Sequence, residues 1–426
     1  MNFPLPEFIA VSASNPWTYV VFGLIGFAFG YTLEMSGFGD SRKLAAQFYF
    51  TEMTVLKVMF TAIVTAMVLL FGAVGLGILN FNQVWVNPTY LSSGILGGLI
   101  MGVGFIIGGF CPTTSLASAS TGKIDGMFFM LGGFVGAFLF GETEVLFDNW
   151  YANSGYFGRV TLDQVFNLPV GAVVLLVALM AFFMFWGAEQ LERIFGKKDL
   201  SKEPKLRFAG AGALFAAAVA VVLIGSPSIE DKYNALIFTR AENEQQIAYS
   251  ADEMLKNRLV FISPAEAFKA RYDQTINLIY LDVRAEADYN LYHIEDAVNA
   301  PQNRLAEILP VLLVEPPANS VFILMSNDET AAVEAWKFLS ASAVPNVYIL
   351  EGGINNWIRV FGQGDETLAA RPKPGAGNDE LAFIFPAALG DRYESCSPDP
   401  VKYETLEFEQ KIKLQLKRDK SGGGCG

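Results

Sequence analysis

Six long apolar segments in the first 226 residues constrain the fold of this chain more than any other feature. They lie at approximately residues 18–35, 58–79, 90–110, 127–147, 170–195 and 208–224. Each approaches the ~20 apolar residues that a helix needs to cross a bilayer. Lipid offers no partners to backbone N–H and C=O groups, so such segments are expected to be helices. The sequence therefore predicts a polytopic α-helical membrane domain of about six helices, residues 1–226, in a lipid bilayer.

The pattern of apolar residues changes near residue 226. Between residues 258 and 365, short apolar runs alternate with segments of helical periodicity. That alternation is typical of an α/β domain with a parallel sheet. We expect a linker over residues 227–257 and a C-terminal extension over residues 366–426. The formal net charge of −13 argues against a nucleic-acid partner, which requires clustered Lys and Arg.

Basic residues are concentrated in alternate connections between the apolar segments. They follow the first, third and fifth segments, at Arg42, Lys43, Lys57 and Lys123 and then from Arg193 to Arg207. Cytoplasmic connections carry an excess of Lys and Arg. The distribution predicts a multi-pass protein of the cell (inner) membrane. Its C-terminal domain is then extracytoplasmic, in the periplasm where the cell has one.

One loop sequence occurs twice without gaps. The stretch SGFGDSRKLAA, residues 36–46, aligns with GGFCPTTSLAS, residues 108–118, and pairs Gly39 with Cys111. Transporters are often built from repeats whose helices are broken by Gly and Pro at the substrate site. We therefore expect re-entrant-type loops that face one another across a pathway. The alternative is that both stretches are only glycine-rich helix ends.

Cys111 directly follows the third apolar segment and is the only cysteine in the first 226 residues. A thiol there can donate a hydrogen bond to a polarisable anion, and a loop that leads into a helix N-terminus favours negative charge. The alternative role is that of a small buried hydrophobe, which is how most free cysteines behave.

Residues 18–195, with both loops in order, resemble the YeeE/YedE sulfur-transport family. The resemblance implies a permease for thiosulfate or a related inorganic sulfur anion, in which cysteine thiols contact the anion by hydrogen bonds without covalent change. Cys111 would be the contacting thiol. The other candidate substrate-binding residues are its neighbours and the facing loop: Thr113, Thr114, Ser115, Gly39 and Ser41.

The first loop departs from that family, because Gly39 stands where the family has a second cysteine. Two explanations stay open. Either one thiol per chain suffices, or two chains of a homo-oligomer supply the pathway together.

Residues 258–365 resemble the rhodanese family. Three motifs occur in the family's order: Asp282-Val283-Arg284 after a buried strand, a central strand at 321–324, and Gly352-Gly353 followed by Trp357. In active rhodaneses the loop after the central strand begins with the cysteine that carries sulfur. The corresponding residues here are Ser326, Asn327, Asp328, Glu329 and Thr330.

No cysteine lies between Cys111 and Cys396. A hydroxyl lacks the nucleophilicity of a thiolate, so we expect no rhodanese turnover by this domain. We expect it instead to dock a partner, such as a periplasmic sulfur-metabolism protein, or to gate the membrane pathway.

The sequence ends in a thiol on a glycine tether, Gly422-Gly423-Gly424-Cys425-Gly426. Glycine-rich segments behave as flexible coil. The ending is similar to the Gly-Gly-Cys-Gly-Gly terminus of the sulfur-carrier subunit of the Sox pathway, which implies a carrier role for Cys425. The alternatives are a cysteine without a role and a disulfide with Cys396. Alternating apolar residues upstream, within 380–388 and 404–416, predict an added β-hairpin.

Three classes of function follow from these observations. The leading one is a non-enzymatic sulfur-anion permease with a non-catalytic rhodanese-like domain. The second is a membrane-anchored sulfurtransferase or sulfur carrier that uses Cys425 or Cys396. The third is a docking subunit for a sulfur-metabolism enzyme. We expect no cofactor and no metal, since the single histidine, His293, provides no ligand cluster.

Overall fold

The computed structural model describes residues 16–198, 206–242, 245–368 and 371–415. These form two compact units. The helical unit comprises the described residues of 16–81 and 87–226, and the α/β unit comprises those of 82–86 and 227–415.

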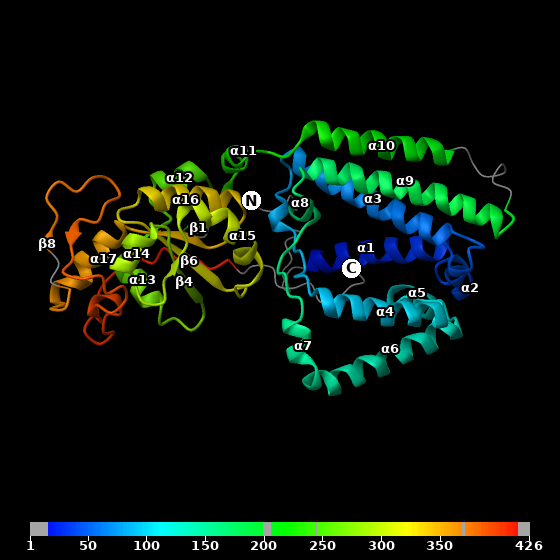
Figure 1. The fold of residues 1–426 in the computed structure, drawn as a ribbon, viewed down its shortest axis with the longest axis horizontal. Coiled ribbons are helices and arrows are strands. Elements are labelled where there is room, and N and C mark those ends of the chain that lie inside the picture. Colours follow the sequence, from blue (N-terminus) through cyan, green and yellow to red (C-terminus); the bar gives the residue numbers. More distant parts are fainter. Residues whose placement is uncertain (1–15, 199–205, 243–244, 369–370, 416–426) are drawn as a thin grey trace. The chain divides into compact units, whose positions relative to one another are not determined.

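Six helices of the helical unit are long and apolar enough to cross a membrane (Figure 1). They are α1 (Pro16–Met35), α3 (Thr54–Gly75), α4 (Leu91–Gly108), α6 (Ile124–Thr143), α9 (Val170–Ile194) and α10 (Leu206–Ile224). The predicted membrane-domain fold with six apolar helices is therefore confirmed. Shorter helices connect them: α2 (Ser41–Ala46), α5 (Pro112–Ser120), α7 (Asp148–Asn153) and α8 (Leu162–Phe166).

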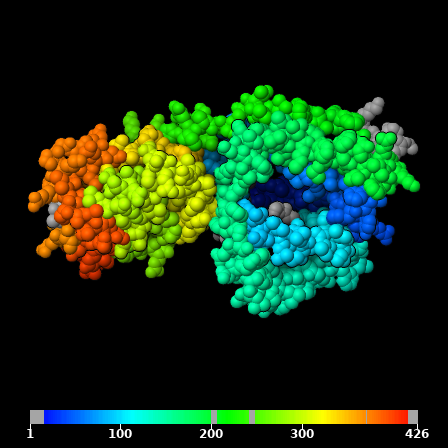
Figure 2. All heavy atoms as spheres, in the orientation of Figure 1, coloured from blue at the N-terminus to red at the C-terminus, as the bar shows by residue number. Residues whose placement is uncertain are grey.

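Small residues bring three of the long helices together. Helices α3, α9 and α10 share an apolar cluster in which Ala178 and Ala218 are fully buried. A Cβ atom on Gly171 of α9 would lie 2.9 Å from the Cα atom of Val222 on α10. Such close approach of backbones is how helices associate in lipid. Figure 2 shows that the helical unit is hollowed on one face between α4 and α9, with α1 at the floor.

An ion pair ties α3 to the end of α9. The carboxylate of Glu192 is fully buried, lies 2.5 Å from Nζ of Lys57, and accepts the N–H of Met53 at 2.7 Å. Met53 precedes the first residue of α3, so Glu192 satisfies a backbone donor that the helix itself leaves unpaired. A buried carboxylate persists only with such partners.

The α/β unit contains a parallel sheet of five strands, in the order β3-β7-β6-β4-β5. This confirms the predicted α/β class with a parallel sheet. The strands are β3 (Phe261–Ile262), β4 (Asn277–Asp282), β5 (Val298–Asn299), β6 (Ser320–Met325) and β7 (Val347–Leu350). The central strand β6 is buried at every position, as its continuous apolar sequence requires.

Two helices precede the first strand of the sheet, and the others alternate with its strands. They are α11 (Ile229–Asn234), α12 (Ala251–Lys256), α13 (Pro264–Ala270), α14 (Glu286–Leu291), α15 (Leu305–Val314), α16 (Thr330–Ala341) and α17 (Gly353–Phe361). An antiparallel hairpin of β1 (Ile237–Glu242) and β2 (Gln245–Ser250) lies between α11 and α12 in the sequence.

The hairpin predicted in the C-terminal extension is wrong in its pairing. Strand β9 (Phe383–Ile384) lies in the first predicted segment, but it pairs with β8 (Arg371–Pro372). Residues 404–415 form no strand. Side chains take the place of a second strand there, because Glu266 Oε1 accepts the N–H groups of Lys411 and Ile412, each at 2.7 Å.

Candidate functional site

The two repeated loops adopt the same backbone turn. Gly37 and Gly109, which the alignment pairs, have φ angles of 76° and 72°. This left-handed conformation favours glycine. The next residues, Phe38 and Phe110, are 2% and 1% exposed and belong to one apolar cluster. The two loops therefore share a backbone conformation as well as a sequence pattern.

Each loop leads into a short helix that contacts the other repeat. Helix α2 contacts α4, and α5 contacts α1 as well as α6. Helices α1 and α4 each end at one of these loops, and Figure 1 shows α2 and α5 at the same end of the helical unit. The two repeats therefore run in the same direction.

The two loops lie directly against each other. The hydroxyl of Ser118 on α5 donates to the carbonyl oxygen of Gly39 at 3.0 Å. A Cβ atom on Gly109 would lie 2.9 Å from the carbonyl oxygen of Ser41. The predicted residues Gly39, Ser41 and Cys111 therefore belong to neighbouring segments.

Cys111 is a free, half-buried thiol directly before the first turn of α5. Its N–H donates to Oγ1 of Thr114 at 3.0 Å, and that hydroxyl donates to the carbonyl of Cys111 at 3.1 Å. The sulfur lies 3.3 Å from the same Oγ1 atom. Ser115 donates to the carbonyl of Pro112 at 2.7 Å. The hydroxyls of Thr114 and Ser115 thus stabilise the start of α5. To donate to an anion, each would have to give up its hydrogen bond to a backbone carbonyl.

Charged side chains surround Gly39, and sequence reasoning did not assign them to this site. Nζ of Lys123 lies 3.0 Å from Oε1 of Glu34. A Cβ atom on Gly39 would be 2.5 Å from Oε2 of Glu34 and 2.7 Å from the same Nζ. Ser41 donates to Oδ2 of Asp125 at 3.2 Å. Lys123 and Asp125 lie just beyond the aligned repeat, so the alignment carried no signal for them.

In the α/β unit, the loop after β6 is held by the predicted Asp-x-Arg motif. The guanidinium of Arg284 pairs with Asp282, with Nη2 and Oδ2 at 2.5 Å. Its Nη1 donates to Oδ1 of Asn327 at 3.1 Å. Ser326 and Asn327 are both buried. Glu329 forms an ion pair with Arg258, in which Oε1 lies 2.7 Å from Nη2.

A carboxylate from the C-terminal extension fills this loop. Asp379 accepts the N–H groups of Asn327 at 2.9 Å, of Asp328 at 3.3 Å and of Ala331 at 3.3 Å. The N–H of Asp379 donates to Oδ2 of Asp328 at 2.8 Å. Two carboxylates are thereby brought together, and burial together with the charge of Asp328 raises the pKa of Asp379. No sequence pattern pointed to Asp379.

The second cysteine of the described chain is inaccessible. Cys396 is fully buried, and its thiol donates to the carbonyl of Gly390 at 3.4 Å. Burial raises its pKa to about 12. The thiolate that sulfur transfer needs is therefore scarce at neutral pH. The candidate carrier Cys425 lies outside the described residues.

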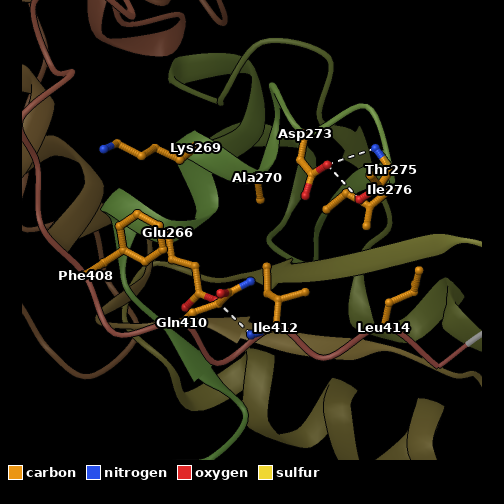
Figure 3. Close-up of a pocket in the computed structure, with 10 residues that line it drawn as sticks. All are labelled: Glu266, Lys269, Ala270, Asp273, Thr275, Ile276, Phe408, Gln410, Ile412 and Leu414. Atoms are coloured by element: carbon orange, nitrogen blue, oxygen red, sulfur yellow. Dashed lines mark hydrogen bonds between the residues drawn. The ribbon is translucent and has the colours of Figure 1, made fainter.

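One pocket of the α/β unit lies apart from all predicted site residues. It has a volume of about 320 Å³ and lies between α13 and the extended segment that contains Phe408 and Ile412 (Figure 3). Glu266 lines it, and burial raises the pKa of this carboxyl group. Within the described parts of the chain, no three His, Cys, Asp or Glu side chains are grouped to hold a metal ion.

Two family models match the chain, one mainly over the helical unit and the other within the α/β unit. Residues 35–239 match the family model described as Sulphur transport, and residues 264–359 match the model of the rhodanese-like domain. No curated protein and no solved structure matches the chain. Asp379 and Cys396 lie beyond both matched regions.

Proposed function

The chain is a multi-pass membrane protein that joins a sulfur transport domain to a rhodanese-like domain, and on this premise we propose that it is a permease for thiosulfate or a closely related sulfur anion. The observation that carries the proposal is the position of Cys111 in one of two loops that face each other and share one backbone turn.

The chemistry of the loops suits a soft anion. A neutral thiol donates a weak hydrogen bond and has a polarisable sulfur, so it can contact an anion without holding it firmly. Weak contacts suit transport, since the anion must also leave. The proposed contacts are Cys111 and Thr113, Thr114 and Ser115 on α5, with Gly39 and Ser41 on the facing loop.

A side chain at Gly39 in the first loop would displace charged groups that now lie there. The ion pair of Glu34 and Lys123 occupies the space that a side chain on Gly39 would take. We therefore favour a pathway with one thiol per chain. If two chains instead form one pathway together, only the dimer should transport the anion.

The rhodanese-like domain serves in this proposal for docking or gating, outside the cytoplasm, and not for sulfur transfer. Its loop begins with Ser326, and Asp379 occupies the N–H groups that would hold a transferred sulfur. Burial of Cys396 also argues against the sulfurtransferase alternative.

Uptake of labelled thiosulfate by cells that lack their own importers tests the function. Cells expressing the chain are expected to accumulate label, and unlabelled thiosulfate is expected to compete far better than sulfate, which lacks the soft terminal sulfur. Uptake no faster than in cells without the protein would contradict the proposal. If sulfate competed equally well, the chain would instead be a permease for oxyanions in general.

A further inference from the structure

Three elements of the helical unit converge on Gly39. Glu34 lies in the last turn of α1, Lys123 directly precedes α6, and Ser118 comes from α5. The two charged side chains form an ion pair with Nζ at 3.0 Å from Oε1 and 3.4 Å from Oε2. Helices from both repeats thus bring one cation and one anion to the face of the first loop.

The ion pair occupies the place that corresponds to the thiol of the second loop. The repeat pairs Gly39 with Cys111, and a side chain on Gly39 would begin within 2.7 Å of Nζ of Lys123. Since Ser118 belongs to the helix that Cys111 begins, the thiol and the ammonium group belong to segments held together by a direct hydrogen bond.

The ion pair of Glu34 and Lys123 can open at a low cost in free energy. The side chains of Lys123 and Glu34 are 41% and 43% exposed, whereas that of Glu192 in its pair with Lys57 is fully buried. Exposed ion pairs contribute at most ~1 kcal/mol to stability. Glu192 also holds the backbone of Met53, so its loss would disturb α3. The carboxylate of Glu34 is held by its two hydrogen bonds from Lys123, so it can give way at little cost.

Other charged groups near the loops do not replace Lys123. Asp125 accepts a hydrogen bond from Ser41. Lys43 donates to the carbonyl of Ser36 at 2.8 Å. Asp40 accepts the N–H of Arg42 at 2.9 Å and so begins α2. Lys43 and Asp40 are thus held within their own loop, whereas Asp125 joins α6 to the start of α2 and is itself an anion.

We propose that Lys123 is the cationic contact for the transported anion, and that Glu34 is an internal anion which holds Lys123 while the pathway is empty. The incoming sulfur anion takes the place of the Glu34 carboxylate on Nζ of Lys123. This replaces one anion by another, so the ammonium group is never left unpaired. The inference rests on the proposed transport function and adds the charge selection that a neutral thiol alone cannot provide.

Initial rates of thiosulfate uptake, measured with the full chain in proteoliposomes over a range of concentrations, test this assignment. Lys123→Gln is expected to raise KM roughly tenfold, which corresponds to ~1.4 kcal/mol of lost anion binding. Lys123→Arg keeps the charge and is expected to recover most of the affinity. Glu34→Gln removes the internal competitor and is expected to lower KM several-fold. Glu142→Gln, the same change at the opposite end of α6, is the control and is expected to leave KM unchanged.

The outcomes separate this inference from the function on which it rests. No uptake by the unaltered protein would overturn the transport function. Uptake with an unchanged KM in Lys123→Gln would overturn the role of Lys123 alone. A purely structural ion pair predicts equal losses for Lys123→Gln and Glu34→Gln, with no rescue by arginine, and that result would also overturn the inference.

Discussion

The hydroxyl of Ser118 donates to the carbonyl oxygen of Gly39 at 3.0 Å, and both residues are buried. Ser118 belongs to the second repeat and Gly39 to the first. This single hydrogen bond therefore joins the two loops between which we place the anion.

Replacement of Ser118 by alanine is expected to loosen the contact between the loops. The buried carbonyl of Gly39 would lose its donor, which costs about 1–3 kcal/mol. The melting temperature and the uptake rate of the purified protein should both fall. Ser120→Ala is the matched control, because that hydroxyl is exposed and donates to Ala117 within the same helix. Equal melting temperatures for the two variants would contradict the role of Ser118.

Introduction of a side chain at Gly39 is expected to impair transport. In Gly39→Ala the new Cβ atom would meet Oε2 of Glu34 at 2.5 Å, so the ion pair must shift. Gly23→Ala on α1 provides the control, since no atom lies within 4 Å of a Cβ atom there. Uptake should fall several-fold in the first variant only. Gly39→Cys should likewise fail to improve uptake, and faster uptake by this variant would show that the loop accepts a second thiol.

Asp379→Ala is expected to reduce the protection of the loop after β6 against hydrogen exchange. The N–H groups of Asn327, Asp328 and Ala331 lose their acceptor. Hydrogen exchange at these amides, followed by mass spectrometry on the full chain, should accelerate about tenfold or more, as expected when ~1.4 kcal/mol of local protection is lost. Glu380→Ala, which removes an exposed partner of Lys373, controls for disturbance of the segment. Unchanged exchange in Asp379→Ala would show that the carboxylate does not hold the loop.

Cys396 is expected to resist alkylation in the folded protein. With a pKa of about 12, only roughly one thiol in ten thousand is ionised at pH 8. Iodoacetamide at this pH should modify Cys396 after unfolding but not before, as read by mass spectrometry. Rapid modification of the native protein would reopen the possibility that Cys396 carries sulfur.

Local patterns in the sequence were sufficient to predict both fold classes. Apolar length alone identifies the six long helices, because lipid forces backbone pairing within each segment. The pairing of Gly37 with Gly109 marks a turn that needs a left-handed residue, so the aligned loops share one geometry. The motif that ends in Arg284 marked the rhodanese resemblance, whereas its hydrogen bond to Asn327 in the loop after β6 emerges only from the structure.

Contacts between distant segments could not be predicted in the same way. Asp379 lies 52 residues from Asn327, and no periodicity links a lone carboxylate to a loop so far away. The ion pair of Glu34 and Lys123 is separated by 89 residues. The strand predicted within 404–416 does not form over residues 404–415 for a related reason. The alternation of apolar residues does not reveal that the side chains of Glu266 and Tyr348, and not a partner strand, accept N–H groups of that segment.

The most direct test of the account is thiosulfate uptake by the Cys111→Ala variant in proteoliposomes. The variant keeps the hydroxyl of Thr114 and its bonds to the backbone of residue 111, so α5 should still form. Ser120→Ala, on the same helix, is the control. The account predicts that uptake falls at least about tenfold in Cys111→Ala, equivalent to ~1.4 kcal/mol, and is unchanged in the control. Uptake by Cys111→Ala at the rate of the unaltered protein would contradict it.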